Sequence, residues 1–521
     1  MLVRPSHRAA LAGLASALLG PSLGVTVAAG AAAPSPRPVT SAHHPSTMHT
    51  SHIRLEDGST YIGPKPCSKY YGWRTASDVP DGLGGPNPLA VCGYTPEQMR
   101  NAYGVADSGL RGDDVTVAIV GAYASPTMLA DANQYSFNHD EPRLRPDQYR
   151  EVIPAAYGHL TDGVCEAPAD WAVEEALDVE AVHAMAPHAN IVYVAAASCD
   201  DIALMAALQS VVTQRLATIV SASWGGIPHS VFGDEDPAVM AAYTALFRQG
   251  SAQGISFLFA SGDCGASDPA AGCGAGSARP QTTYPAQDPW VTAVGGTSLG
   301  IGPEGRYLGV TGWGDERAVL APDGSAWTPM PGQYRFGAGG GTSEDVPQPW
   351  YQQGKVPQAL ASTLLTGARS ARPMRVLPDV AMDADPVTGF LTGLTETRPD
   401  GSTAYSESSI GGTSLATPLF AGMQADAQER VGHPQGLLNP ALYALAGSRA
   451  FHDVTATSLS RWAPGPGSPL ADVVDLGRDA AGVHQARLYR LGDDGPLAAS
   501  LGYDDVTGIG SPNGVYLHSW G

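Results

Sequence analysis

A serine at position 414 has the surroundings of a hydrolytic nucleophile. It follows the turn residues Gly412 and Thr413 and precedes an apolar stretch that contains Pro418. This order predicts a helix that begins near Ser414, where unpaired backbone N–H groups and the helix dipole favour a developing oxyanion. A hydroxyl attacks a carbonyl poorly unless a base takes its proton. The identity of that base therefore decides which class of hydrolase the chain could be.

Glu174 and Asp178 are the candidate base and its partner. Their i, i+4 spacing places both carboxyls on one face of a helix. Most other residues from 172 to 182 are apolar, which predicts that the helix is buried on most sides. Two close buried carboxylates cannot both ionise cheaply, so they would share a proton, with Glu174 as the base and Asp178 orienting it. Asp170 and Glu174 have the same spacing, so the residues alone leave this register open.

A third acidic residue, Asp263, lies between Gly262 and Cys264 directly after the apolar run 255–260. A strand that ends there would place the Asp263 carboxyl at the carboxyl end of the sheet, facing the same cleft. A carboxylic acid that stays protonated can donate a hydrogen bond to an oxyanion. The alternative interpretation is an Asx turn, in which the Asp263 side chain only caps its own loop.

The elements that must position these residues follow an α/β pattern. Apolar, β-branched runs at 115–120, 190–196, 217–222 and 255–260 are typical of buried parallel strands. Helical segments at 170–186 and 201–215 lie between them. The alternation predicts a mostly parallel central sheet with helices on both faces and with catalytic residues at the carboxyl ends of its strands.

Composition limits the partners of this chain. The 521 residues are 43% hydrophobic and 15% charged, and the formal net charge is −21. Such acidity argues against nucleic acid or an anionic membrane as a partner. After the N-terminus no stretch reaches the ~20 apolar residues of a membrane span. A monomeric globular protein is expected.

The N-terminal residues have the organisation of a secretory signal. Basic residues, an apolar run and an Ala-rich stretch occupy residues 1–33, which predicts a signal peptide and an extracellular protein. Residues 34–65 are rich in Pro, His and Ser and are expected to be a flexible linker or a short propeptide. The folded domain is then expected over residues 66–521.

The six cysteines are expected to serve structure. In an exported chain they allow fifteen pairings, and sequence proximity favours Cys67 with Cys92, Cys165 with Cys199, and Cys264 with Cys273. None of the spacings is CxxC, so zinc is not expected.

The candidate catalytic motifs occur in a fixed order with other recognisable stretches. Glu174, Asp178 and Glu180 come first, Ser261-Gly262-Asp263-Cys264-Gly265 follows, and Gly412-Thr413-Ser414 with Pro418 comes last. Further matching stretches lie at 94–103, 221–225, 284–297, 339–343 and 378–381. In this combination, over about residues 90–521, the chain resembles the sedolisin family of serine-carboxyl peptidases.

The resemblance implies a subtilisin-like fold in which carboxylates replace the catalytic histidine and aspartate, acting on proteins or peptides in acid. The run Leu177-Asp178-Val179-Glu180 matches the family's motif and settles the register, with Glu174 as the base. Ser414 is the implied nucleophile and Asp263 the implied oxyanion-hole acid. The implied substrate-binding residues, which would border the cleft and pair with substrate backbone, are Ser223, Trp224 and Gly225.

The resemblance also implies one Ca²⁺ near the C-terminus. Its ligands would be the carboxylates of Asp453 and Asp504 and the backbone carbonyls of Val454, Ser500 and Gly502, an oxygen set of the kind calcium takes. The interval between the two aspartates is longer than the family's compact loop. Two further departures are the short segment before residue 90, where members usually carry a large propeptide, and Gly121, where members often have an acidic residue.

Two other classes of protein remain open on the sequence. A neutral, subtilisin-type peptidase would need a catalytic histidine, but His183 is five residues from Asp178 and off its helical face, which favours an ordinary partly buried or surface histidine. A non-catalytic secreted binding protein would be expected to have lost a catalytic position. The tetrapeptide that begins at Gly296 repeats the serine motif, but glycines and a proline follow Ser298, which predicts a turn after a strand.

Overall fold

A central sheet carries the expected parallel strands. The computed structural model describes residues 44–45, 48–49, 66–83, 85, 87–268, 276–398, 401–455 and 470–520. The expected signal peptide therefore lies outside the described residues. The eight-stranded sheet has the order β12-β11-β10-β6-β3-β5-β4, and β17 also pairs with β11. Its strands are β3 (Thr116–Ala122), β4 (Tyr149–Val152), β5 (Asn190–Ala196), β6 (Ile219–Ala222), β10 (Ser256–Ala260), β11 (Thr292–Ile301), β12 (Tyr307–Gly312) and β17 (Val380–Asp383).

Every pair in this sheet is parallel except β11 with β12. The four apolar runs of the sequence fall on β3, β5, β6 and β10, and the two predicted helical segments fall on α3 (Pro168–Met185) and α4 (Asp201–Gln214). The prediction of an α/β fold with a mostly parallel sheet is thus confirmed.

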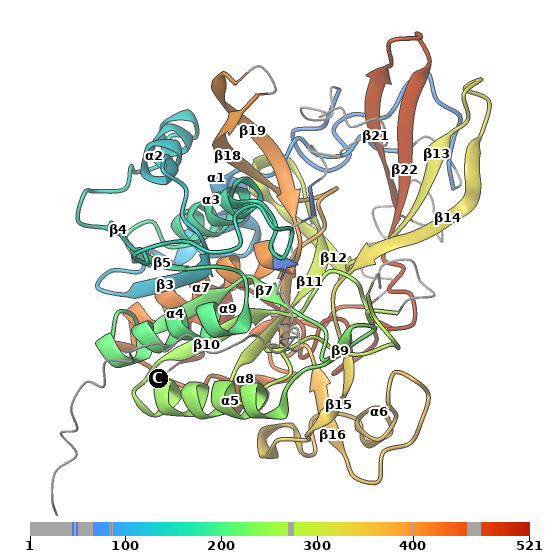
Figure 1. The fold of residues 1–521 in the computed structure, drawn as a ribbon. Helices are drawn as coiled ribbons and strands as arrows, with labels where there is room; N and C mark the ends of the chain where they lie inside the picture. The colour runs from blue at the N-terminus through green and yellow to red at the C-terminus, as the bar shows by residue number, and fades with distance from the viewer. Residues whose placement is uncertain are drawn as a thin grey trace, which may run out of the picture. The chain divides into compact units, whose positions relative to one another are not determined.

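Helices cover both faces of the sheet (Figure 1). On β3, Val117 and Ile119 point to the core shared with α3 and α7 (Thr413–Val431), whereas Ala118 and Val120 point to the core shared with α4 and α5 (Pro237–Ala252). This alternation is what a strand buried on both faces requires. The carboxyl ends of β3, β6 and β10 consequently lie at one edge, beside the start of α7.

Smaller elements surround this framework. They are α1 (Pro96–Ala102), α2 (Met128–Asn138), β7 (Trp224–Gly225), β8 (His229–Ser230), β9 (Gly233–Asp234), β15 (Gly341–Pro347), α6 (Gln358–Ala361), β16 (Met374–Leu377), β18 (Phe390–Thr397), β19 (Thr403–Gly411), α8 (Asn439–Leu445), β20 (Phe451–His452), β23 (Ser511–Pro512) and α9 (Gly514–Leu517).

A second, four-stranded antiparallel sheet explains the long interval between the two candidate calcium aspartates. Its order is β14-β13-β22-β21, from β13 (Gly314–Leu320), β14 (Trp327–Gly337), β21 (Ala471–Arg478) and β22 (His484–Leu491). The β21–β22 hairpin occupies much of the sequence between Asp453 and Asp504. In Figure 1 this sheet projects away from α4 and α5.

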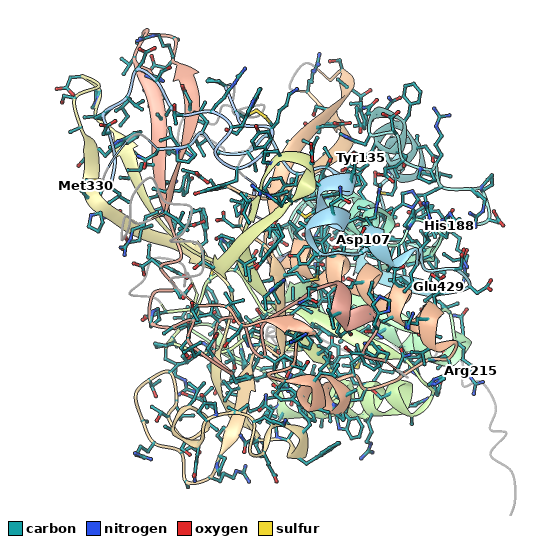
Figure 2. The ribbon with its side chains drawn as sticks, turned by 180° about the vertical axis from the view of Figure 1, so that it is seen from behind. Asp107, Tyr135, His188, Arg215, Met330 and Glu429 are labelled. Atoms are coloured by element: carbon teal, nitrogen blue, oxygen red, sulfur yellow. A yellow bond between two sulfur atoms is a disulfide. The ribbon has the colours of Figure 1, made fainter. Side chains whose placement is uncertain are left out.

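The end of α7 remote from Ser414 is held by one carboxylate. Glu429 accepts the backbone N–H groups of Arg111, Gly112 and Asp113 at 2.8, 2.7 and 3.1 Å. The Asp113 carboxylate in turn contacts His188 Nδ1 at 2.9 Å. Figure 2 shows Glu429 and His188 on the same side of the ribbon. These bonds fix the position of the helix that carries the candidate nucleophile.

The disulfides follow the predicted pairing as far as the structure describes it. Cys67 is bonded to Cys92, and Cys165 is bonded to Cys199. Cys264 is also disulfide-bonded, and its expected partner Cys273 lies outside the described residues. Among the described residues no helix is long and apolar enough to cross a membrane.

Buried aspartates join the second sheet to the first. Asp315 on β13, Asp472 on β21 and Asp385 after β17 are all 0% exposed. Burial raises the pKa of each, and the charge of Asp385 raises the pKa of Asp315 and Asp472 further. Asp315 and Asp385 share a hydrogen bond, and Trp313 Nε1 donates to Asp315 at 3.2 Å. Carboxyls this close are compatible with the fold when they retain protons.

We therefore expect the protein to be more stable in acid than at neutral pH. A carboxyl whose folded pKa is raised above its unfolded value binds protons more tightly in the folded state, so the free energy of unfolding falls as pH rises from ~4 through the folded pKa. Melting temperature measured at pH ~4 and ~7 should show the loss, at about 2 °C or more for each kcal/mol. Asp385→Asn should reduce the difference in melting temperature between the two pH values. The exposed Asp107, labelled in Figure 2, provides the control Asp107→Asn, which should leave it unchanged.

Candidate active site

Ser414 is the second residue of α7 and is completely buried. The helix begins after Gly412, whose φ of 107° lies in the region that favours glycine. The N–H of Ser414, in the first turn, has no acceptor within the helix. The prediction of a serine at a helix N-terminus is confirmed, and this N–H is available for an oxyanion.

Pro418 frees the carbonyl of Ser414 for another contact. In a regular helix the residue four positions on would donate its N–H to this carbonyl, but proline has none. Ser223 Oγ approaches the Ser414 carbonyl oxygen at 3.2 Å instead, and Ser414 Oγ donates to the Ser223 carbonyl at 3.3 Å. The hydroxyl of each serine thus contacts the backbone carbonyl of the other.

The same Ser223 hydroxyl connects α7 to α3. It contacts Asp178 Oδ1 at 2.7 Å as well as the Ser414 carbonyl. The Ser223 hydroxyl donates to Asp178 Oδ1, and its oxygen also lies within hydrogen-bond distance of the Ser414 carbonyl. Burial, followed by the nearby charge of Glu174, raises the pKa of Asp178, although the Ser223 bond lowers it. A raised pKa at Asp178 suits a site that works in acid.

Glu174 lies one turn before Asp178 on the buried face of α3. Glu174 and Asp178 are each 2% exposed, whereas Asp170 is exposed and accepts the N–H of Ala167 at the start of the helix. The alternative register with Asp170 is therefore wrong, because that residue caps the helix. Since α3 packs directly against α7, Glu174 and Asp178 lie on the element beside Ser414.

Asp263 lies on the other side of the α7 N-terminus. Its Oδ1 accepts both the backbone N–H and the hydroxyl of Thr413, each at 2.8 Å, and Thr413 Oγ1 accepts the N–H of Gly262 at 3.0 Å. Burial raises the pKa of Asp263 to about 7, although the two Thr413 bonds lower it. The residue contacts the element of the nucleophile, which a simple Asx turn would not do.

The side chain of Trp224 is buried, whereas its motif suggests a residue that borders the cleft. Its side chain is 1% exposed, donates from Nε1 to the Val120 carbonyl at 2.8 Å and packs edge-on against Phe259. The indole is part of the core between β3 and β10. The backbone of Trp224 and Gly225 forms the short strand β7, and its pairing with a substrate stays a prediction. The Ser223 side chain connects Asp178 with Ser414.

Sequence reasoning missed two supporting groups. Thr413 anchors Asp263, and its position directly before the nucleophile was the available signal. Glu175 is 1% exposed, accepts the Ser125 N–H and the Tyr149 hydroxyl, and burial raises its pKa to about 8. Spacing gave no indication of Glu175, because its partners come from distant segments.

Tyr193 accounts for the glycine at position 121. A Cβ built on Gly121 would lie 2.6 Å from the Tyr193 hydroxyl, so no acidic side chain fits there without displacing that ring. Burial raises the pKa of Tyr193, and the charges of Glu175, Asp178 and Glu174 raise it further. The Tyr193 hydroxyl, which donates to the Ala122 carbonyl at 3.2 Å, thus occupies the space that an acidic side chain at position 121 would need.

Ser298 and His183, the two residues that could be mistaken for catalytic groups, have structural roles. Ser298 is buried in the middle of β11, opposite Thr311 of β12, so the prediction of a turn is wrong: the strand continues through its glycines to Ile301. His183 is 4% exposed, contacts the Pro142 carbonyl through Nε2 at 2.6 Å, and burial lowers its pKa to about 4. It is more buried than expected and shows no contact with Ser414.

Four of the five candidate calcium residues form two contacting pairs. Asp453 accepts the N–H of Gly502 at 3.1 Å, and Asp504 accepts the N–H of Ser500 at 3.2 Å. Asp504 is buried and also accepts the N–H groups of Val506 and Thr507. Burial raises the pKa of Asp504 to about 7. Within the described ranges, no group of three or more His, Cys, Asp or Glu side chains is arranged to hold a metal. A metal here would depend on backbone carbonyls as well.

Comparisons with known proteins find relatives that are similar over more than half of the chain. Kumamolisin of Bacillus sp. (strain MN-32) is 32% identical over 434 residues, which are 82% of this chain and 63% of kumamolisin. Human tripeptidyl-peptidase 1 is 29% identical over 299 residues, which are 55% of this chain and 41% of that protein. The chain thus spans less than two thirds of the length of either relative.

A solved structure shows the same fold. Pseudomonas sedolisin, a serine-carboxyl proteinase, aligns with a TM-score of 0.56 and 22% identity, covering 82% of this chain and 98% of that one. The model of the subtilase family matches residues 155–446, which is more than half of the chain and includes Glu174, Asp178, Asp263 and Ser414. The chain therefore belongs to the subtilase family, as a sedolisin-like member of it.

Proposed function

We propose that the protein is a secreted serine-carboxyl peptidase that hydrolyses peptide bonds of proteins or peptides at acidic pH. The observation that carries the proposal is the continuous buried connection from Asp178 through Ser223 to Ser414. Asp263 is held against the same helix end through Thr413. Acidic side chains thus flank the N-terminus of α7 from two directions.

We propose the following reaction for these residues. Ser414 Oγ attacks the carbonyl carbon of the substrate, and Glu174 takes the hydroxyl proton while Asp178 orients Glu174. The resulting oxyanion accepts hydrogen bonds from the Ser414 N–H and from protonated Asp263. When the C–N bond breaks, Glu174 returns the proton to the leaving amine, and an acyl group remains on Ser414. Water then attacks this ester by the reverse sequence and releases the acid.

Acid conditions are inferred from Asp263. An oxyanion-hole acid must be protonated to donate, and its pKa of about 7 keeps Asp263 protonated below neutrality. As pH rises through that value, Asp263 ionises and its charge would repel the oxyanion. The rate should therefore fall on the alkaline side.

A pH–rate profile on denatured protein tests the proposal. Wild-type kcat should be highest in acid and should decline through pH ~7, whereas Asp263→Asn, neutral at every pH, should lose much of that decline. Asp263→Ala should lower kcat about 10²- to 10³-fold at pH ~4, the usual effect of removing one oxyanion donor. A neutral optimum would instead favour a histidine-dependent peptidase. Absence of activity at all pH values would favour a binding protein.

Cleavage outside the cell fits other observations. Disulfides form in oxidising compartments, and the structure has two complete ones among its described residues. We propose extracellular peptides or proteins as substrates, with no nucleic acid or membrane partner.

We propose in addition one structural Ca²⁺ at the loop that contains Gly502. The donor set fits a hard cation, because the Asp453 and Asp504 carboxylates and the carbonyls of Val454, Ser500 and Gly502 are all oxygens. The contacts of Asp453 and Asp504 with neighbouring residues of this loop support the proposal. The ion would tie two distant segments together and would take no part in the chemistry.

Chelation should lower the melting temperature. A ligand at 100 times its Kd contributes about 2.7 kcal/mol to folding, so EGTA should produce a drop of several degrees that Ca²⁺ reverses. Asp453→Asn should abolish the response. Asp505→Asn, in the same loop but outside the ligand set, is the matched control and should keep it. An unchanged melting temperature and metal content after chelation would remove calcium from the proposal.

A further inference from the structure

Two buried aspartates lie where the second sheet meets the central sheet, and each is close to a segment of the candidate active site. Asp315 is on β13, and Asp385 follows β17. Trp313 Nε1 donates to Asp315 Oδ2 at 3.2 Å, and the Val387 N–H donates to Asp385 Oδ1 at 2.8 Å. The other oxygen of each carboxyl is buried, and the two carboxyls bond to each other.

The bond between the two carboxyls requires a proton, because an ionised carboxylate only accepts. Burial raises the pKa of both residues, but their mutual bond raises that of Asp315 and lowers that of Asp385, which makes Asp315 the donor. The titratable groups that face the pair are other acids and phenols: Asp383, Asp472, Tyr71, Tyr94 and Tyr334. None of these offers a positive charge to a pair that has lost its proton.

On one side the pair is attached to the turn that precedes the nucleophile. The Gly412 N–H donates to the carbonyl of Ala384, the residue directly before Asp385, at 2.6 Å. A Cβ on Gly411 would overlap the same carbonyl, so the two backbones are in direct contact. The backbone at Asp385 thus fixes the residue two positions before Ser414.

On the other side the pair is attached to the loop that carries Asp263. Asp315 is opposite Phe336 of β14, and the next residue of that strand, Gly337, donates its N–H to the Asp263 carbonyl at 3.0 Å. Gly339 donates its N–H to the carbonyl of the residue before Asp263 at 2.6 Å. The position of the candidate oxyanion-hole acid therefore depends on where β13 and β14 lie.

We propose that Asp315 and Asp385 are positioning residues whose shared proton keeps the Asp263 loop and the Ser414 turn aligned. The inference rests on the proposed peptidase function and adds a device that couples this function to pH. When the proton is lost, two carboxylates are in contact inside the protein, where their repulsion is strong. They have to move apart, and each is attached to one half of the site. The catalytic residues then lose their alignment although none of them has changed.

Asp315→Asn tests this device, because asparagine reproduces the protonated aspartate at every pH. Its amide N–H can donate to Asp385, and its oxygen can accept from Trp313. Hydrogen exchange followed by mass spectrometry, on peptides that contain Gly337 or Gly412, reports the two attachments. At pH ~7 these peptides should exchange about 10-fold faster in wild type than in Asp315→Asn, and at pH ~4 the two proteins should exchange alike.

Glu316→Gln is the matched control for the exchange experiment. Glu316 is the next residue of β13, but its carboxylate bonds to Arg490 of β22 at 2.8 Å. This variant loses one charge, as Asp315→Asn does, and leaves the aspartate pair intact. Its exchange rates should match those of wild type at both pH values.

Kinetics separate positioning from a purely structural role. Asp315→Ala removes the donor, so kcat on a denatured protein at pH ~4 should fall about 10²-fold, the usual cost of misplaced reacting groups, while KM stays within a few-fold. Asp315→Asn should recover most of this loss, because it restores the bond to Asp385. A structural role would lower the melting temperature of Asp315→Ala and leave kcat of the folded protein unchanged.

Equal exchange of wild type and Asp315→Asn at pH ~7 would overturn the inference and leave the peptidase in place. Equal kcat of wild type and Asp315→Ala at pH ~4 would do the same. Absence of peptide hydrolysis by wild type at every pH would overturn the proposed function and, with it, the positioning role.

Discussion

Replacing Ser414 with alanine should lower kcat for peptide hydrolysis by about 10⁴- to 10⁶-fold, the range seen when a hydrolase loses its nucleophile. The substitution removes the only atom that can form the acyl intermediate, whereas the buried position and the helix remain. The residual rate should come from the oxyanion donors. Steady-state kinetics on a denatured protein at pH ~4 would measure the effect.

Ser298→Ala is the control for this experiment, because Ser298 has the same local tetrapeptide. It is buried in β11, so its loss should reduce the melting temperature and leave kcat within a few-fold of wild type. If Ser298→Ala lost activity and Ser414→Ala kept it, the assignment of Ser414 as the nucleophile would be wrong.

Glu174→Gln should lower kcat by about 10²- to 10⁴-fold, the usual contribution of a positioned general base. Glutamine keeps the shape of the side chain and loses the capacity to take the Ser414 proton. It also removes a charge beside Asp178, so the pKa of Asp178 should fall toward its ordinary range, since Glu174 is one cause of its elevation. The pH profile of the residual activity should shift with it.

Asp170→Asn is the matched control, because Asp170 has the same spacing from Glu174 as Asp178 has. Its carboxylate is exposed and caps the start of α3, so we expect a small loss of stability and unchanged kcat. If Asp170→Asn and Glu174→Gln lowered kcat equally, the base would have to be placed one turn earlier.

These predictions share one physical origin, the burial of carboxyls. Asp178, Asp263 and Asp385 lie in different parts of the structure, yet burial is the first cause of the raised pKa at each. Each is therefore more easily protonated than an exposed aspartate. Activity and stability are consequently expected to depend on pH in the same direction, both favouring acid.

Much of the framework was predictable because it depends on local pattern. The apolar runs of β3, β5, β6 and β10 have the length and β-branched content of buried strands, and burial follows from composition alone. Ser414 was recognisable because the glycine before it and the proline after it constrain the backbone in known ways. Cysteine pairing followed from sequence proximity, which limits the loops that a disulfide can close.

Contacts between distant segments were not predictable from such patterns. Trp224 reads as a cleft residue in its motif, but its ring fills the core, since the direction of a side chain depends on what packs around the strand. Ser298 reads as a turn residue, but pairing with β12 extends the strand through it.

The sequence by itself determined the α/β class and identified the candidate nucleophile and the three candidate acidic residues, because each is encoded within a few consecutive positions. Only the tertiary structure decided how they are connected. The Ser223 hydroxyl between Asp178 and Ser414, and the bonds of Thr413 to Asp263, join residues that are far apart in the chain. Such contacts depend on where the strands and helices meet.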